Sequence, residues 1–265
     1  MPYATREGLN LYYEREGDAE PPILFVHGWC CDHTFFGPQF EHFKSSHTVV
    51  AMDLRGCGRS DRPEAGYDIP TLADDVAWLA GEIGISRPIV IGHSLGGMVA
   101  IELAARHPSV PLAIIADDPG PINPLPETRR IFEDFAVDLD GPDGEAARRA
   151  WVEDTPGPTV DADRRNWIVE TMCAVPLSVA AAGIRGVSEW NGVEALTRCE
   201  QPLLVLRSDT GGSNEAARLL PLKGDLHFGV TVGAGHFHQL EVPEQVTSMM
   251  ERFIDVAAPK SRAED

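Results

Sequence analysis

The chain has 265 residues, of which 43% are hydrophobic, and this length and composition predict one large core. Its 22 Lys and Arg residues against 41 Asp and Glu residues give a formal charge of −19. So acidic a balance argues against nucleic acid and anionic membrane surfaces as partners, because both attract clustered cations.

Apolar runs alternate with helical patterns over the first 121 residues. Alternating polarity over residues 9–15 predicts an edge strand with one solvated face. Continuous apolar runs, typical of strands buried on both faces, follow at 23–26, 48–52, 89–91 and 113–116. Helical patterns lie between them at 34–43, at 71–82 with Thr71 as the cap, and at 97–106. This alternation predicts an α/β protein with a mostly parallel sheet and helices on both faces.

The pattern changes between about residue 119 and residue 191, where prolines cluster. Short polar helical patterns appear there at 127–135, 144–152 and 163–173. We interpret residues 122–190 as an inserted helical cap on a core made of residues 1–121 and 191–256. The core pattern resumes with a strand at 203–206, a helix near 214–220, a strand at 228–232 and a final helix beginning at Pro243. Residues 257–265 have the composition of a flexible charged tail.

The strongest chemical motif is Gly92-His93-Ser94-Leu95-Gly96, which lies between a predicted strand and a predicted helix. A serine on such a sharp turn is forced outward, and glycines two residues before and after it avoid steric clashes. The turn also places Ser94 at a helix N-terminus, where free N–H groups and the helix dipole favour negative charge. The oxyanion of an acyl transfer would carry such a charge.

A serine nucleophile needs a general base, and the chain has nine histidines. His236 follows the strand at 228–232 on a stretch of small residues, Gly233-Ala234-Gly235, which allows a tight loop over the sheet edge. We therefore predict His236 as the base, rather than His238. His93, beside the serine, is interpreted as a buried structural histidine.

The third member of such a triad is a carboxylate that holds the imidazole in one tautomer. The strand at 113–116 ends in Asp117-Asp118, of which Asp117 comes first, and the strand at 203–206 is followed by Asp209. A carboxylate at the end of the strand next to the Ser94 strand can reach the base. Turn capping would account for either aspartate as well.

Backbone donors for an oxyanion can come from two loops. His27-Gly28-Trp29 follows the strand at 23–26, and its glycine lets that backbone approach a ligand. The N–H groups of Trp29 and Leu95 are therefore the candidate oxyanion donors.

Together these residues resemble the α/β-hydrolase superfamily. The resemblance implies an α/β-hydrolase fold, with an eight-stranded, mostly parallel sheet flanked by helices and an inserted helical cap. It implies Ser94 as nucleophile, His236 as base, and the Trp29 and Leu95 amides as oxyanion hole. Asp53, Gly56 and Gly58 are similar to the family's structural turn residues. The matching motifs span residues 5–256 in the family's order: His27-Gly28-Trp29, the stretch 53–61, the stretch 92–97 and the stretch 235–243.

The position of the triad carboxylate in this sequence differs from one arrangement that is common in the family. Many members carry it in a Gly-Asp-x-Asp stretch after the seventh strand, whereas here Gly211 stands where the second aspartate would be. Other members place the acid after the sixth strand, and Asp117 matches that position. The resemblance therefore favours Asp117, with Asp209 as the alternative.

The leading hypothesis is a hydrolase that cleaves a small carboxylic ester or lactone through an acyl-enzyme. Ser94 argues against the dehalogenases and epoxide hydrolases of this fold, which use an aspartate nucleophile. One alternative is a cofactor-independent 2,4-dioxygenase of the 3-hydroxy-4-oxoquinoline type, with a His–Asp dyad. Residues 27–33 resemble the loop of those enzymes, although Cys31 and Leu95 stand where that family carries histidine. The other alternative is a non-catalytic ligand-binding protein.

We expect a small-molecule substrate and no cofactor or metal, because the five cysteines show no metal-ligand spacing. They form no disulfide framework either, and the N-terminus has no hydrophobic signal region, so we expect a cytoplasmic protein without a membrane partner. The sequence neither predicts nor excludes a homodimer. Six side chains of the cap are candidates for the substrate pocket: Phe132, Phe135, Trp151, Trp167, Met172 and Trp190.

Overall fold

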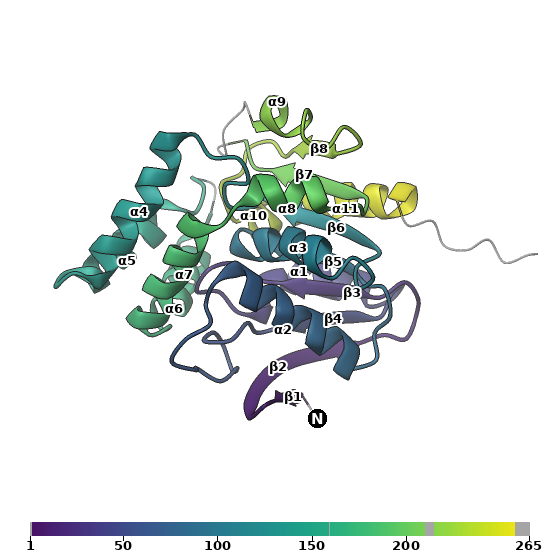
Figure 1. Cartoon of the computed structure of the whole chain (residues 1–265), viewed down its shortest axis with the longest axis horizontal. Helices are drawn as coiled ribbons and strands as arrows, with labels where there is room; N and C mark the ends of the chain where they lie inside the picture. The colour runs from purple at the N-terminus through teal and green to yellow at the C-terminus, as the bar shows by residue number, and fades with distance from the viewer. Residues whose placement is uncertain (1, 159, 210–214, 258–265) are drawn as a thin grey trace, which may run out of the picture.

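The computed structural model describes residues 2–158, 160–209 and 215–257 (Figure 1). Their strands form one eight-stranded sheet in the order β1-β2-β4-β3-β5-β6-β7-β8. β2 is antiparallel to both of its neighbours, and every other pair is parallel, so the predicted sheet is confirmed. The strands are β1 (Tyr3–Arg6), β2 (Leu9–Glu16), β3 (Ile23–Val26), β4 (Val49–Met52), β5 (Ile89–His93), β6 (Ala113–Asp117), β7 (Leu203–Arg207) and β8 (His227–Val230).

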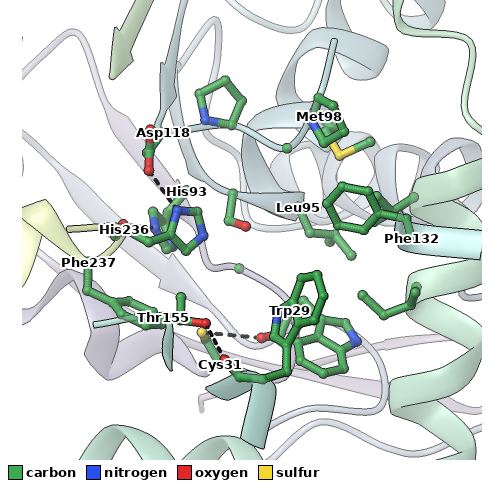
Figure 2. A pocket seen from close by; sticks show the side chains of 18 of the residues that line it. Trp29, Cys31, His93, Leu95, Met98, Asp118, Phe132, Thr155, His236 and Phe237 are labelled. Atoms are coloured by element: carbon green, nitrogen blue, oxygen red, sulfur yellow. Dashed lines mark hydrogen bonds and ion pairs between the residues drawn. The ribbon is translucent and has the colours of Figure 1, made fainter. Parts of the chain in front are cut away.

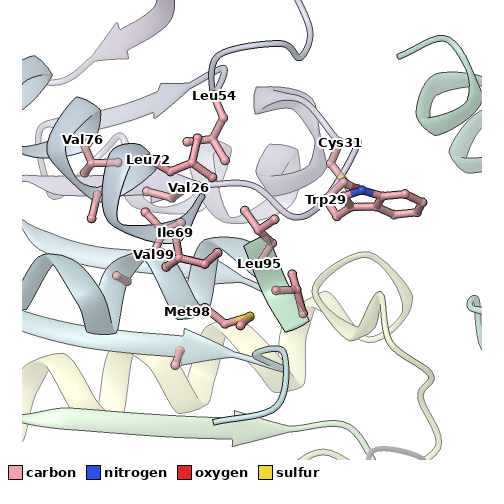
Figure 3. Packing of buried hydrophobic residues seen from close by; sticks show 14 of the residues in the cluster. Val26, Trp29, Cys31, Leu54, Ile69, Leu72, Val76, Leu95, Met98 and Val99 are labelled. Atoms are coloured by element: carbon pink, nitrogen blue, oxygen red, sulfur yellow. The ribbon is translucent and has the colours of Figure 1, made fainter. Parts of the chain in front are cut away.

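The central strands are buried on both faces, which explains their continuous apolar runs. Successive side chains point to opposite faces, so Leu24 and Val26 enter one core while Ile23 and Phe25 enter the other. The first core is covered by α2, α3 and α8, which lie in front of the sheet in Figure 1; Figure 3 shows part of its packing. The second is covered by α1 and α11. The covering helices are α1 (Gly37–Phe43), α2 (Ile69–Glu82), α3 (Leu95–Arg106), α8 (Gly192–Arg198) and α11 (Pro243–Ala257).

Two local predictions in this core need correction. β2 is not an edge strand, because the short strand β1 pairs with its outer side. The cap of α2 is Asp68, not Thr71: the Asp68 carboxylate accepts the N–H of Thr71 at 2.9 Å. The helix therefore begins at Ile69 and includes Pro70 in its first turn, where a missing N–H costs nothing.

Residues 122–190, the helical insertion, lie between β6 and β7 and form the group of helices on the left of Figure 1. α4 packs along α7. The sequence patterns indicated α4, α5 and α6 but missed α7, which contains Gly183 and Gly186. A Cβ on Gly186 would lie 2.8 Å from the carbonyl oxygen of Tyr67, so this glycine lets α7 approach the core closely. The helices are α4 (Pro126–Asp140), α5 (Gly144–Asp154), α6 (Ala162–Cys173) and α7 (Leu177–Glu189).

Short elements complete the described chain. The predicted helix at 214–220 is α9, although residue 214 is outside the described residues, and so are residues 258–265 of the predicted tail. Within the described ranges, no single helix is long and apolar enough to cross a bilayer; α6 and α7 together meet that test but are bent by 92°. The remaining elements are η1 (His33–Phe36), α9 (Glu215–Leu219) and α10 (His238–Glu241).

Candidate active site

Ser94 occupies the turn between β5 and α3, with a φ of 53° and a ψ of −117° that side chains rarely adopt. The glycines on either side make this turn sterically allowed. A Cβ on Gly92 would lie 2.0 Å from the carbonyl oxygen of Gly96, and a Cβ on Gly96 would lie 2.1 Å from that of Val26. Both positions therefore require glycine, as the sequence motif predicts.

A cavity of about 780 Å³ opens at this end of the sheet (Figure 2). Ser94 and His236 both line it, so the fold brings the serine and the predicted base to one site although 142 positions separate them (236 − 94). The helical insertion supplies part of the wall: Phe132, Trp151 and Met172.

Three of the six candidate pocket side chains do not line this cavity and pack elsewhere. Phe135 stacks on Trp151 with ring centroids 4.1 Å apart. Trp167 lies 4.6 Å from the ring of Phe35, and the indole N–H of Trp190 donates to Glu102 at 2.8 Å. These three residues support the walls rather than face a ligand.

The imidazole of His236 is held by Asp118. Its Nδ1 donates to Asp118 Oδ2 at 2.7 Å, as the dashed line in Figure 2 shows, and Asp118 is 2% exposed. The same carboxylate accepts the backbone N–H of Ser208 at 3.1 Å and lies 3.4 Å from the Arg207 guanidinium. Burial alone would raise the pKa of Asp118, but the His236 hydrogen bond and the charges of His236 and Arg207 hold that pKa well below its usual range. Asp118 therefore remains ionised.

The prediction that Asp117 pairs with His236 is wrong. Asp117 is the last residue of β6, and its Oδ1 lies 2.7 Å from Nε2 of His238, with both side chains fully buried. Successive residues of a strand point to opposite sides, and a φ of 39° at Asp118 turns the chain further at this point. The adjacent aspartates therefore reach two different histidines. In the sequence, the Asp117-Asp118 pair after the strand indicated a carboxylate near His236, but it did not indicate which of the two aspartates contacts that histidine.

Asp209, the alternative candidate for the triad acid, contacts a different loop residue. Its carboxylate accepts the backbone N–H of Gly233 at 2.6 Å in an exposed position. The residue ties two loops together and does not contact His236 in the described structure.

The Asp117–His238 contact makes a testable contribution to stability. Burial lowers the pKa of His238, but the charge and hydrogen bond of Asp117, together with the charges of Asp118 and Glu241, raise that pKa above its usual value. A raised pKa in the folded state means that the stabilisation is complete below the unfolded pKa of about 6.5 and is lost as the pH rises through the folded value.

We therefore expect Asp117→Asn to lower the free energy of unfolding by about 1–3 kcal/mol below about pH 6, and by less at alkaline pH. Urea unfolding of the two proteins from about pH 5.5 to about pH 9 measures this difference. The same difference at every pH would show that His238 does not titrate against Asp117.

The two predicted oxyanion donors lie beside Ser94. A Cβ on Gly28 would come within 3.2 Å of Ser94 Cβ, so the loop before Trp29 runs against the serine. Leu95 is the first residue of α3, where an N–H has no acceptor within the helix. Among the described residues, neither the Leu95 nor the Trp29 amide has a backbone acceptor. The Trp29 indole donates to the carbonyl of Ala180 at 2.8 Å, which anchors this loop to α7.

Comparison with known proteins identifies the family of the chain. The sequence pattern of the alpha/beta hydrolase family matches residues 23–248, which is most of the chain. The chain belongs to the alpha/beta hydrolase family. The resemblance inferred from the sequence motifs is thereby confirmed, and so is the α/β-hydrolase fold.

Individual proteins are similar to the chain over most of its length. The chain is 30% identical over 261 residues to the 2-(acetamidomethylene)succinate hydrolase of Mesorhizobium japonicum, and the match covers 91% of the chain and 90% of that protein. The structure of Est816, an N-acyl homoserine lactone degrading enzyme, superposes with a TM-score of 0.80 at 26% identity, covering 95% and 100% of the two chains. A Thermogutta terrifontis esterase superposes with a TM-score of 0.83 at 23% identity, covering 97% of each chain, and shows the fold alone. For seven other curated relatives, the match spans only 31% to 52% of their length.

In this alpha/beta hydrolase, buried histidine and aspartate side chains support the site. His93 Nε2 donates to the carbonyl of His236 at 2.8 Å, and burial holds the pKa of His93 well below its usual value, so the ring stays neutral. Asp53 Oδ1 accepts the N–H of His33 at 2.7 Å and Oδ2 accepts that of Arg59 at 2.8 Å.

Gly56 and Gly58 have φ values of 84° and 50°, as turn residues of this stretch require. Within the described ranges, no group of three or more His, Cys, Asp or Glu side chains is arranged to hold a metal ion.

Proposed function

We propose that the chain hydrolyses a small carboxylic ester or lactone through an acyl-enzyme on Ser94, with His236 as base and Asp118 as acid. One observation carries the proposal: Ser94 and the His236–Asp118 pair open onto the same cavity. A serine on a strained turn, an imidazole and a buried carboxylate are the parts that nucleophilic acyl transfer needs.

In this mechanism, His236 Nε2 takes the proton of the Ser94 hydroxyl while the serine oxygen attacks the carbonyl carbon. The Trp29 and Leu95 N–H groups stabilise the negative charge that develops on the carbonyl oxygen. His236 then gives its proton to the departing alkoxide, and the acyl group remains on Ser94. The same base activates a water molecule that releases the acid. Asp118 stays charged throughout and stabilises the imidazolium, as its lowered pKa allows.

Relatives of the chain support this class of reaction. The relative that matches over nearly its whole length is named as a hydrolase of a substituted succinate, and a structural relative at 26% identity as an enzyme that degrades a lactone. We also propose that the helical insertion acts as a cap and selects the substrate, because Phe132, Trp151 and Met172 from it line the cavity.

A fluorophosphonate probe tests the proposal directly, since it reacts with activated serine hydroxyls. We expect a single adduct on the intact protein, which peptide mapping places on Ser94, together with hydrolysis of 4-nitrophenyl acetate and butyrate. Labelling at another serine, or none, would count against a nucleophilic Ser94. Oxygen uptake with a 3-hydroxy-4-quinolone, in a protein that the probe does not label, would favour the dioxygenase alternative.

A further inference from the structure

The cavity contains a guanidinium group for which the described residues supply no hydrogen-bond or ion-pair partner. Arg218, from α9, lines the cavity together with Ser94 and His236. Its side chain is partly buried, and its Nε is fully buried without a hydrogen-bond acceptor. Among the described residues, no carboxylate forms an ion pair with it. A buried donor without an acceptor costs free energy, and a ligand that supplied the acceptor would recover that cost.

The other charged side chains of the cavity either contact a partner or are exposed to solvent. Arg207 pairs with Asp118 at 3.4 Å and also donates to the carbonyl oxygen of Pro119. Asp154, at the end of α5, is exposed, so solvent screens its charge. The protein as a whole carries a formal charge of −19 and repels anions at long range. A cation inside the cavity therefore has its clearest use in binding an anion there.

We propose that Arg218 binds a carboxylate carried by the substrate, so that the hydrolysed compound is the ester or lactone of an acid with a second, free carboxylate. A guanidinium presents paired donors that match a planar carboxylate and a single negative charge. The apolar side chains of Trp29, Met98 and Phe132 line the same cavity and would surround the hydrocarbon part of the substrate. This proposal rests on the proposed function of Ser94.

Two esters that differ only in a terminal carboxylate provide the test: 4-nitrophenyl hexanoate and the mono-4-nitrophenyl ester of hexanedioic acid. We expect the native protein to prefer the acidic ester. Arg218→Gln should lower kcat/KM for that ester by about 10- to 100-fold, mainly through KM, and change the neutral ester by less than about threefold. Arg218→Lys should give an intermediate loss, because an ammonium keeps the charge but not the paired donors.

Arg252→Gln is the matched control, because it makes the same charge change on an exposed residue of α11 and should leave both esters unaffected. An equal loss on both esters in Arg218→Gln, or no loss on either, would overturn the proposal. Calorimetric binding of hexanedioate to Ser94→Ala separates it from the proposed function, since binding needs no turnover. Binding that disappears in Ser94→Ala/Arg218→Gln supports the carboxylate site even if Ser94 proves not to be the nucleophile, and binding that persists overturns it.

Discussion

Ser94→Ala is expected to lower kcat/KM for 4-nitrophenyl acetate and butyrate by at least about 10³-fold. The loss should fall on kcat, because the hydroxyl forms the bond to the acyl group and the cavity wall that binds the substrate is otherwise unchanged. Alanine keeps the Cβ of serine and adds no bulk at the φ of 53°, so the turn should persist. Steady-state kinetics with both esters measures the effect, and a thermal unfolding curve shows whether the variant is folded.

His236→Ala is the variant with which the kinetics of Ser94→Ala must be compared. If the nucleophilic mechanism holds, both variants lose activity to a similar extent, because serine and base act as one unit. Retention of most activity toward the true substrate in Ser94→Ala, with its loss in His236→Ala, would show that His236 acts without an acyl-enzyme. That result would favour the His–Asp dyad of the dioxygenase alternative, here with Asp118.

Asp118→Asn is expected to lower kcat by about 10³- to 10⁴-fold. An asparagine at this position cannot accept the Nδ1 proton of His236 and at the same time stabilise a positive imidazolium. The substitution also removes the negative charge that lies 3.4 Å from the Arg207 guanidinium. Kinetics on the same esters, at a temperature well below unfolding, separates this loss from instability.

Two neighbouring aspartates serve as matched controls for Asp118. Asp117→Asn should keep kcat within about tenfold of the native value, because Asp117 contacts His238 and not the base. Asp209→Asn should keep it within about threefold, since among the described residues Asp209 accepts the N–H of Gly233 in an exposed position and does not contact His236. A loss in Asp117→Asn as large as that in Asp118→Asn would mean that the acid is not Asp118 alone.

Most of the fold could be predicted from the sequence because its signals are local. Apolar runs such as Ile23–Val26 are buried on both faces of the sheet, and the glycines around Ser94 are required by contacts within one turn. The carboxylate that contacts His236 could not be predicted to the residue, since the direction of each side chain depends on the φ of 39° at Asp118. Arg218 carried no local signal at all, because only the path of the chain between β7 and β8 brings it to the cavity.

The end of β6 holds one loop at two points. Asp117, its last residue, and Asp118, the residue after it, contact His238 and His236, which are themselves only two residues apart. The helical insertion also contacts this loop, because the Glu241 carboxylate accepts the N–H of Gly157 at 3.1 Å and that of Gly235 at 2.9 Å. An exchange of residues 122–190 for those of a related protein should therefore retain the reaction chemistry only if it keeps the contact of Gly157 with Glu241 and that of Ala180 with the Trp29 indole. Selectivity and reactivity are in this sense coupled, because the segment that faces the substrate also helps to hold the loops of Trp29 and His236.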